Sequence, residues 1–183
     1  IIPVVEPTGM VTVNSVAVLA TIFPSTSPEK TTFATRSSAV PAITTSTPGL
    51  AAAGAKLAVI DNPNYESEST ILVEDTLKCL QELSNYHRRQ LTIPVIGLTG
   101  SNGKTTSKEL IAAALSTKYK VACTKGNLNN HIGVPLTLLS INDNHEIAII
   151  EMGANHQKEI EFLCSICEPD FGYITNFGKA HLE

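Results

Sequence analysis

The chain has 183 residues, of which 43% are hydrophobic, 16% charged and 5% aromatic, and it contains no Trp. This length is enough to bury a real core, so neither disulfides nor metals are needed to hold it together. The formal net charge of −4 gives no electrostatic support to nucleic-acid binding. The charge is unevenly spread, because residues 1–55 hold four charged side chains and residues 56–183 hold twenty-six.

The cysteines and apolar stretches argue against a secreted or membrane protein. Cys164 and Cys167 have the spacing of half a zinc site or of a redox pair, but no second Cys-x-x-Cys occurs and a structural zinc needs four ligands. We therefore interpret them as small apolar residues on one helix face. Residues 10–23 are too short and too polar to span a membrane, and no basic segment precedes them. We expect a reduced, cytoplasmic protein without membrane insertion.

The first fifty residues differ from the remainder. Residues 21–48 contain thirteen Ser or Thr and four Pro, a composition typical of irregular or disordered chain. From residue 50 the pattern becomes more regular: residues 50–55 resemble a helix end, and residues 57–60 form a short apolar run that a turn follows. Apolar residues then recur every three to four positions, which predicts an amphipathic helix over residues 75–90 with Asp75 as its cap.

After residue 93 apolar strands alternate with helices. This rhythm predicts a parallel α/β sheet covered on both faces, with ligands bound beyond the carboxyl ends of its strands. In the helix over residues 104–116 we expect Leu110, Ile111, Ala114 and Leu115 to form the apolar face. The other expected elements are strands at 94–99, 119–123, 146–150 and 171–175 and helices at 135–139 and 156–166.

The sequence Thr-Gly-Ser-Asn-Gly-Lys-Thr-Thr at residues 99–106 follows a strand and opens a helix. That context favours a phosphate-binding loop, because glycines let several N–H groups face one anion and the helix start adds positive potential. Lys104 can reach the outer phosphates, and the Thr105 hydroxyl can bind Mg²⁺. The spacing departs from the common Gly-x4-Gly-Lys-Thr pattern, since five residues separate Gly97 from Gly103. The alternative is a tight strand-to-helix turn without a ligand.

Two further residues lie where such a sheet carries chemistry. Glu151 follows a buried strand, and a carboxylate at that point commonly holds Mg²⁺ directly or through water. The alternative is an acid that faces solvent at the strand end. His181 follows the strand at 171–175 on the same edge, although a lone His is more often a surface or capping residue.

Four stretches together carry a family resemblance: residues 96–106, 125–137, 150–155 and 174–183. The second reads Lys-Gly-Asn-Leu-Asn-Asn-His-Ile-Gly-Val-Pro-Leu-Thr. From about residue 50 onward the chain resembles the Mur ligase family, in which the five-residue glycine spacing of the phosphate loop is usual. The Asn-rich stretch resembles the member that adds D-alanyl-D-alanine to UDP-N-acetylmuramoyl-tripeptide in peptidoglycan synthesis.

The resemblance implies an activity and a set of site residues. ATP would phosphorylate the terminal carboxylate of the UDP-linked tripeptide, and the amine of D-alanyl-D-alanine would attack the acyl phosphate. Lys104, Glu151 and His181 would be the catalytic residues, with one Mg²⁺ on Thr105 and Glu151 and a second on His181. The implied ATP-binding residues are Gly100, Ser101, Asn102, Gly103, Lys104, Thr105 and Thr106, and the implied substrate-binding residues are Asn127, Asn129, Asn130 and His131.

The same resemblance divides the chain into three parts. Residues 1–49 are an atypical N-terminal segment, residues 50–92 the remainder of a UDP-substrate-binding domain, and residues 93–183 the first part of a central ATP-binding domain. Because the family continues beyond this point with a domain that helps to bind the incoming dipeptide, we expect the chain alone to catalyse no ligation. We also expect a monomer. The alternatives are another Mur-type or folylpolyglutamate-synthase-like amide ligase, or a nucleotide-binding module without catalysis.

Residues 1–49 leave two interpretations open, because none of the family's uridine-contacting residues can be identified in them. One is a Ser/Thr/Pro-rich linker. The other is a shift of reading frame upstream of about residue 50. Codons for residues 41–49 can, when two bases are skipped, encode Gly-Asn-Asn-Tyr-Phe-Asn-Ala-Gly, which resembles a substrate-binding loop of the family. Sequencing the DNA distinguishes the two.

Overall fold

A computed structural model describes residues 9–11, 17–19 and 57–178 of the chain. The expected helix end at 50–55, most of residues 1–49 and His181 lie outside these residues. The chain divides into two compact units, residues 1–80 and 81–183, which are described separately below. No helix in the described ranges is long and apolar enough to cross a membrane.

The described part of the first unit is built around a small mixed sheet. Its strand order is β2-β1-β3-β4, in which β1 and β2 are antiparallel and the other neighbours are parallel. The apolar run that the sequence indicated at 57–60 is one of these strands, and the turn after it contains a short 3-10 helix. The elements are β1 (Gly9–Val11), β2 (Ala17–Leu19), β3 (Leu57–Ile60), η1 (Pro63–Tyr65) and β4 (Thr70–Leu72).

The predicted amphipathic helix is confirmed as α2 (Thr76–Gln90). Its first turn is capped as expected, because Oδ1 of Asp75 accepts a hydrogen bond from the N–H of Lys78 at 2.8 Å. Such a cap satisfies one of the N–H groups that a helix start leaves without an intrahelical partner. The boundary between the two units falls within this helix, between Leu80 and Gln81.

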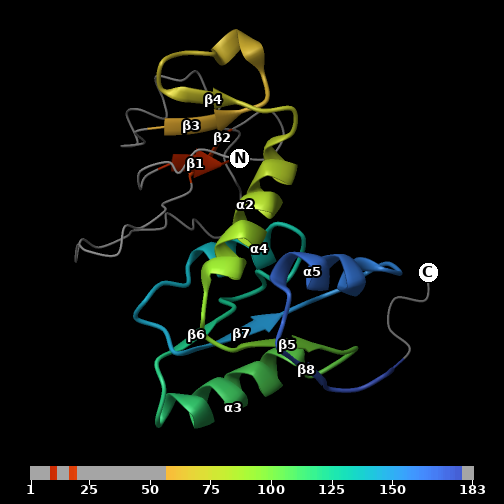
Figure 1. The fold of residues 1–183 in the computed structure, drawn as a ribbon. Helices are drawn as coiled ribbons and strands as arrows, with labels where there is room; N and C mark the ends of the chain where they lie inside the picture. The colour runs from red at the N-terminus through yellow and green to blue at the C-terminus, as the bar shows by residue number, and fades with distance from the viewer. Residues whose placement is uncertain (1–8, 12–16, 20–56, 179–183) are drawn as a thin grey trace. The chain divides into compact units, whose positions relative to one another are not determined.

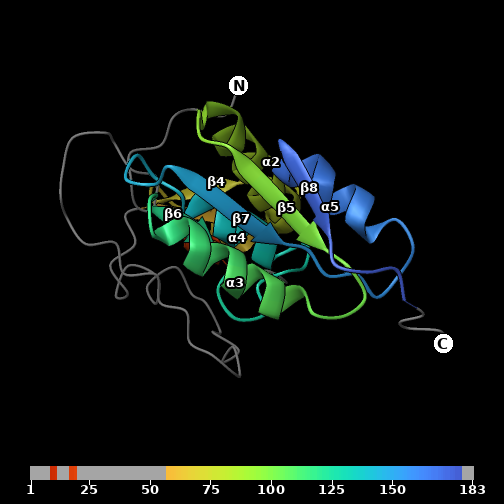
Figure 2. The same cartoon turned by 90° about the horizontal axis from the view of Figure 1, so that it is seen from below.

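The second unit contains the predicted parallel sheet. Its strand order is β6-β7-β5-β8, and every neighbouring pair is parallel; Figure 2 shows β7, β5 and β8 running in the same direction. The central strands are almost fully apolar and buried, as expected for a sheet covered on both faces. The strands are β5 (Val95–Thr99), β6 (Val121–Cys123), β7 (Ile147–Glu151) and β8 (Phe171–Ile174).

Three helices of this unit cover the sheet. Helix α3 (Lys104–Ser116) lies on one face, and α4 (Gly133–Leu139) and α5 (Glu159–Cys167) lie on the other (Figure 1). The start and end of α3 agree with the sequence prediction. Helix α4 begins two residues earlier than predicted, before rather than at Pro135, and α5 begins three residues later than predicted.

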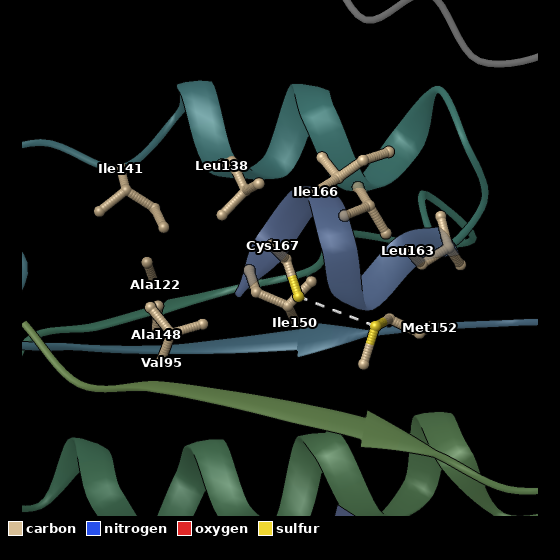
Figure 3. Close-up of a cluster of buried hydrophobic side chains, with 11 residues drawn as sticks. Val95, Ala122, Leu138, Ile141, Ala148, Ile150, Met152, Leu163, Ile166 and Cys167 are labelled. Carbon is tan, nitrogen blue, oxygen red and sulfur yellow. Dashed lines mark hydrogen bonds between the residues drawn. The ribbon is translucent and has the colours of Figure 1, made fainter. Parts of the chain in front are cut away.

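A large cluster of buried hydrophobic side chains fills the core between the sheet and helices α4 and α5 (Figure 3). Strand side chains alternate between the two faces of a sheet, so every second residue of β5 and β7 reaches this core. Leu91, Ile93, Ile160 and Cys164 pack against its edge. We call this set the apolar face; its buried members are Val95, Ala122, Val134, Leu138, Ile141, Ala148, Ile150, Met152, Leu163, Ile166 and Cys167.

The two cysteines of α5 belong to this packing. Their sulfur atoms lie 3.9 Å (Cys164) and 3.8 Å (Cys167) from the sulfur of Met152, and the second contact is drawn in Figure 3. Burial raises the pKa of Cys167 to about 12, so its thiol stays neutral. Within the described residues, no three His, Cys, Asp or Glu side chains gather as a metal site.

The predicted apolar face of α3 is wrong in two of its four residues. Leu110 is 67% exposed and Ala114 is exposed, whereas Ile111 and Leu115 are partly buried. The helix instead turns Ala112 and the charged Lys108 toward the sheet. Positions 108 and 112, four residues apart, face the core. The prediction looked for apolar residues on the buried face, and it failed because one of these positions is a lysine.

Candidate functional site

The segment between β5 and α3 curls tightly at two glycines. Gly100 has a φ of +136° and Gly103 a φ of +74°, conformations that residues with a side chain rarely adopt. A Cβ at Gly100 would also collide with Thr175, 2.0 Å from its Oγ1 and 3.0 Å from its backbone nitrogen. The loop therefore needs glycine both for its backbone conformation and for its close contact with the chain after β8.

The backbone N–H groups of this loop fall into two sets. Those of Ser101 and Asn102 are engaged, because they donate to the backbone oxygen and to Oδ1 of Asn176 at 3.3 and 3.1 Å. Those of residues 103–106 donate no hydrogen bond within the described part of the chain. Four free N–H groups at a helix start attract an anion, because the helix dipole places a partial positive charge there.

The only charged side chain of the loop folds over it. The Nζ atom of Lys104 donates to the backbone oxygen of Gly100 at 2.7 Å and lies 3.5 Å from that of Ser101. Backbone carbonyls are weaker acceptors for an ammonium group than an anionic oxygen. An anion seated in the loop would therefore draw this ammonium into direct contact.

Glu151 ends β7 beside the loop, and only 1% of it is exposed. Its Oε1 atom accepts hydrogen bonds from Nδ2 of Asn129 at 2.9 Å and from the Thr105 hydroxyl at 3.3 Å. Its Oε2 atom is buried and has no hydrogen-bond donor among the residues that the structure describes. A buried carboxylate oxygen without a donor is rare, and it indicates that this position serves a cation.

A buried lysine that the sequence analysis missed lies behind this carboxylate. Lys108 is 1% exposed; its Nζ donates to the backbone oxygen of Thr124 at 2.7 Å and lies 4.0 Å from Oε2 of Glu151. It also contacts the exposed Glu109 at 2.9 Å. The Thr124 hydroxyl in turn accepts the N–H of Glu151 at 2.8 Å. Lys108 follows Lys104 by one helical turn, a spacing that could have shown that both face the same way.

The Asn-rich stretch between β6 and α4 does not act as one cluster. Asn129 touches Glu151, and its backbone oxygen accepts the N–H of Gly153 at 2.7 Å. The Oδ1 atom of Asn130 makes local contacts: it accepts the N–H groups of Ile132 and Gly133 at 3.1 and 2.9 Å. Such bonds fix the chain at the start of α4.

The remaining residues of this prediction are either exposed or outside the described chain. The side chains of Asn127 and His131 are exposed, and within the described ranges only backbone atoms of these two residues take part in hydrogen bonds. His181 lies outside the described residues. The structure thus brings together Lys104, Thr105, Glu151 and Asn129, with Lys108 and Thr124 behind them.

The ligand atoms at this point suit a hard divalent cation. The Thr105 hydroxyl and the Glu151 carboxylate supply oxygen donors, and Mg²⁺ prefers oxygen donors and often binds few protein groups beside phosphate and water. Among the described residues, the buried Oε2 of Glu151 accepts no hydrogen bond, and the nearest cation, the Nζ of Lys108, lies 4.0 Å away. The arrangement can therefore hold a phosphate chain on the loop and a cation next to it.

Comparison with known proteins identifies the family. Residues 98–183 match the Mur ligase middle domain. The chain is 48% identical over 124 residues to the UDP-N-acetylmuramoyl-tripeptide–D-alanyl-D-alanine ligase of Bacillus subtilis, with 68% of this chain and 27% of that protein covered. It is 42% identical over 132 residues to the Escherichia coli enzyme of the same name, with 72% and 29% covered. The chain thus spans less than a third of the length of these relatives.

Solved structures agree with this result. A crystal structure of MurF from Acinetobacter baumannii superposes with a TM-score of 0.69 at 40% identity, covering 74% of this chain and 30% of that one. MurF ligase from Thermotoga maritima in complex with ADP superposes with a TM-score of 0.65 at 36% identity, covering 70% and 30%. The phosphate loop, the parallel sheet and these matches lead to one conclusion: the chain belongs to the Mur ligase family.

Proposed function

We propose that this chain provides the nucleotide-phosphate and Mg²⁺ site of an ATP-dependent ligase that adds D-alanyl-D-alanine to UDP-N-acetylmuramoyl-tripeptide in peptidoglycan synthesis. The names of the relatives support this substrate pair, and the ADP complex of a similar structure supports the nucleotide. We place the reaction in the cytoplasm, in a monomeric enzyme that requires neither nucleic acid nor membrane insertion. Residues 50–92 would belong to the UDP-substrate-binding domain and residues 93–183 to the ATP-binding domain.

The observation that carries the proposal is the set of free N–H groups at residues 103–106 beside Lys104. An ATP phosphate seated there would accept these N–H groups and replace the backbone carbonyls as the partner of the Lys104 ammonium. The Ser101 and Asn102 N–H groups are engaged elsewhere, so we remove these two from the predicted backbone contacts between Gly100 and Thr106. Ser101 and Asn102 then shape the loop.

Mg²⁺ would be held by the Thr105 hydroxyl and by Glu151, with His181 as the proposed residue for a second ion. When bound, the metal supplies positive charge that neutralises the phosphates during transfer. Asn129 fixes the carboxylate of Glu151 from one side through its amide, and Thr124 fixes the backbone of the same residue. Asn127, Asn130 and His131 remain proposed substrate contacts.

The chemistry explains why such a site is needed. A substrate carboxylate is a poor electrophile at neutral pH, and transfer of a phosphoryl group to it creates a leaving group that an amine can displace. Protein groups accelerate such a transfer mainly by positioning the reactants and by stabilising charge. Lys104 and the N–H groups of residues 103–106 are placed for both tasks, since they bind and orient the phosphates.

A chimeric enzyme tests this proposal. The segment of the Bacillus subtilis relative that matches this chain, 124 residues at 48% identity, is replaced by the residues of this chain. We expect the chimera to form product from ATP, UDP-N-acetylmuramoyl-tripeptide and D-alanyl-D-alanine, and we expect Lys104→Met within it to lower kcat/KM by at least about 100-fold, the scale for loss of a charged transition-state contact.

The control substitution is Lys118→Met, which removes an ammonium group from an exposed position after α3, outside the loop. It should leave the chimera active. A folded chimera that binds ATP but makes no product would favour a nucleotide-binding module without catalysis. Product formed with a different amine in place of D-alanyl-D-alanine would favour another amide ligase.

A further inference from the structure

We propose that Thr175 and Asn176, directly after β8, are positioning residues that aim the Gly103 N–H at the nucleotide phosphates. They do so by fixing the peptide group between Asn102 and Gly103. The inference rests on the proposed function, because it concerns the same phosphate loop. No comparison and no sequence pattern assigned a role to either residue, and neither carries a charge.

The first observation is a two-way pairing between a side chain and the loop backbone. Oδ1 of Asn176 accepts the N–H of Asn102 at 3.1 Å, and Nδ2 of Asn176 donates to the backbone oxygen of Asn102 at 3.1 Å. One amide side chain thus satisfies both backbone polar groups of one loop residue, as a neighbouring strand would. Two bonds to the same residue fix its orientation, which a single bond would not.

The second observation is a second donor to the same oxygen. The Thr175 hydroxyl donates to the backbone oxygen of Asn102 at 2.6 Å. A carbonyl oxygen has two lone pairs, and here Thr175 and Asn176 use both. The direction of this carbonyl is therefore determined by two independent donors from the chain after β8.

The planarity of the peptide bond converts this contact into an effect on the free N–H groups. In a trans peptide the C=O of one residue and the N–H of the next point in opposite directions, and the structure contains no cis peptide among its described residues. Holding the Asn102 carbonyl toward residues 175 and 176 therefore turns the Gly103 N–H away from them. That N–H is the first of the four free donors at the start of α3.

Neighbouring contacts brace the same segment. The Ser101 hydroxyl donates to the backbone oxygen of Gly178 and accepts its N–H, both at 2.9 Å. The N–H of Thr175 donates to the backbone oxygen of Thr99 at 2.9 Å, which continues the pairing of β5 with β8. The chain after β8 thus holds the loop at Thr99, Ser101 and Asn102. The side-chain polar groups of Thr175 and Asn176 are used on the loop backbone, so these two residues position the phosphate ligands and are not phosphate ligands themselves.

The test measures the affinity of the 183-residue chain for Mg·ADP by calorimetry in wild type, Thr175→Val, Asn176→Ala and the double variant. Thr175→Val removes one hydrogen bond while Asn176 still holds the carbonyl, so the affinity for Mg·ADP should fall roughly threefold. Asn176→Ala removes both bonds of the amide side chain, so the affinity should fall about tenfold. The double variant should lose more than the product of the two, because the carbonyl then has no donor.

A matched control separates positioning from a general effect of the substitution. Thr117→Val removes a hydroxyl that donates to a backbone oxygen, that of Ala114 at 2.7 Å, at the far end of α3. It should leave the affinity for Mg·ADP unchanged. Thermal unfolding of each variant shows that the fold is retained, and both target side chains lie near the surface.

A readout without nucleotide tests the geometry directly. In ¹H–¹⁵N spectra of the free chain, the Gly103 amide signal should move in Asn176→Ala and further in the double variant. The Asn102 amide, which loses its acceptor, should exchange with solvent faster. Thr117→Val should change neither signal.

The outcomes distinguish the inference from the proposed function. The proposed function would be overturned if the wild-type chain bound no Mg·ADP or if Lys104→Met bound it as well as wild type does. The spectra of the free chain would still test the positioning role in that case. A double variant with wild-type affinity and an unmoved Gly103 signal would overturn the inference while leaving the proposed function intact.

Discussion

The two faces of the second sheet are built on different principles. The apolar face, toward α4 and α5, contains a cluster of eleven buried hydrophobic residues, and the buried Arg88 meets it at the backbone oxygen of Cys167 and the two following acidic residues. The face toward α3 has a much smaller buried apolar cluster, Leu98, Ala112 and Ile149, and it contains the buried Lys108 and Glu151. The same strands contribute side chains to both faces, since Ile149 and Ile150 are neighbours on β7 and point to opposite sides.

The difference separates stability from chemistry within one sheet. Apolar burial stabilises a fold without direction, whereas buried charges cost free energy unless they are paired and hydrogen-bonded. Hydrogen bonds from Asn129 and Thr105 and the nearby charge of Lys108 offset this cost for Glu151. We therefore expect substitutions on the apolar face to change stability alone, and substitutions on the α3 face to change stability and ligand binding together.

The largest expected effect on stability comes from the apolar face. Leu138→Ala removes a fully buried side chain of α4 and should lower the free energy of unfolding by about 3 kcal/mol, the usual scale for a cavity of this kind. Urea unfolding measures it, with the exposed Leu110→Ala as control, which should change little. A folded Leu138→Ala protein with weakened Mg·ADP binding would break the proposed separation between the two faces.

Next comes the buried lysine of the α3 face. Lys108→Met should lower the free energy of unfolding by about 2 kcal/mol, because it leaves the Thr124 carbonyl without its donor and Glu151 without its nearest cation. Glu109→Gln changes only the exposed partner of the same ammonium and should have little effect.

A double variant sharpens this prediction. Adding Glu151→Gln to Lys108→Met removes the buried negative charge as well, so the two effects on unfolding should be less than additive. Full additivity would mean that Lys108 and Glu151, at 4.0 Å, do not interact.

Thr124→Val should have a smaller effect, about 1 kcal/mol on unfolding. It removes the hydroxyl that accepts the N–H of Glu151 at 2.8 Å while keeping the shape of the side chain. Because that N–H fixes the residue that would hold Mg²⁺, we also expect weaker Mn²⁺ binding in the presence of ADP, measured by electron paramagnetic resonance. An effect on stability without any effect on Mn²⁺ would assign Thr124 to folding alone.

The smallest effect concerns the start of α5. The N–H groups of Asn155 and His156 donate to the Glu159 carboxylate and hold its pKa below the ordinary value. A lowered pKa in the folded state means that this contribution to stability is present above the pKa of the unfolded chain and is lost as the pH falls through the folded pKa. In acid unfolding, wild type and Glu159→Gln should therefore converge at low pH. A constant difference from neutral pH to pH 2 would contradict this.

Much of the second unit could be predicted from the sequence, and for a clear reason. Its strands are short apolar runs between glycines, turns and amphipathic segments, so the order of elements and the parallel sheet followed directly. The phosphate-binding loop at residues 99–106 could also be predicted, because its glycines and its Lys-Thr pair lie between a strand and a helix. Glu151 followed from its position at the end of a buried strand.

What could not be predicted depends on contacts between distant segments. Lys108 was missed because a charged residue within a helix is normally exposed, and only the fold brings it to Glu151 and Thr124. The pairing of Asn176 with Asn102 joins residues that are 74 positions apart. Asn130 was grouped with Asn129 because both belong to the stretch that carries the family resemblance. In the structure, Asn130 accepts backbone N–H groups at the start of α4, whereas Asn129 contacts Glu151.

The most direct test of the central claim is an amide chemical-shift map of the 183-residue chain on titration with Mg·ATP. The claim is that the nucleotide phosphates bind the free N–H groups of residues 103–106 on the α3 face. It predicts that these four amide signals shift most, that Lys104→Met suppresses the shifts, and that the signals of Leu138 and Leu163 on the apolar face stay in place. Saturable binding in which these four signals do not move, or in which the largest shifts lie on the apolar face, would contradict it.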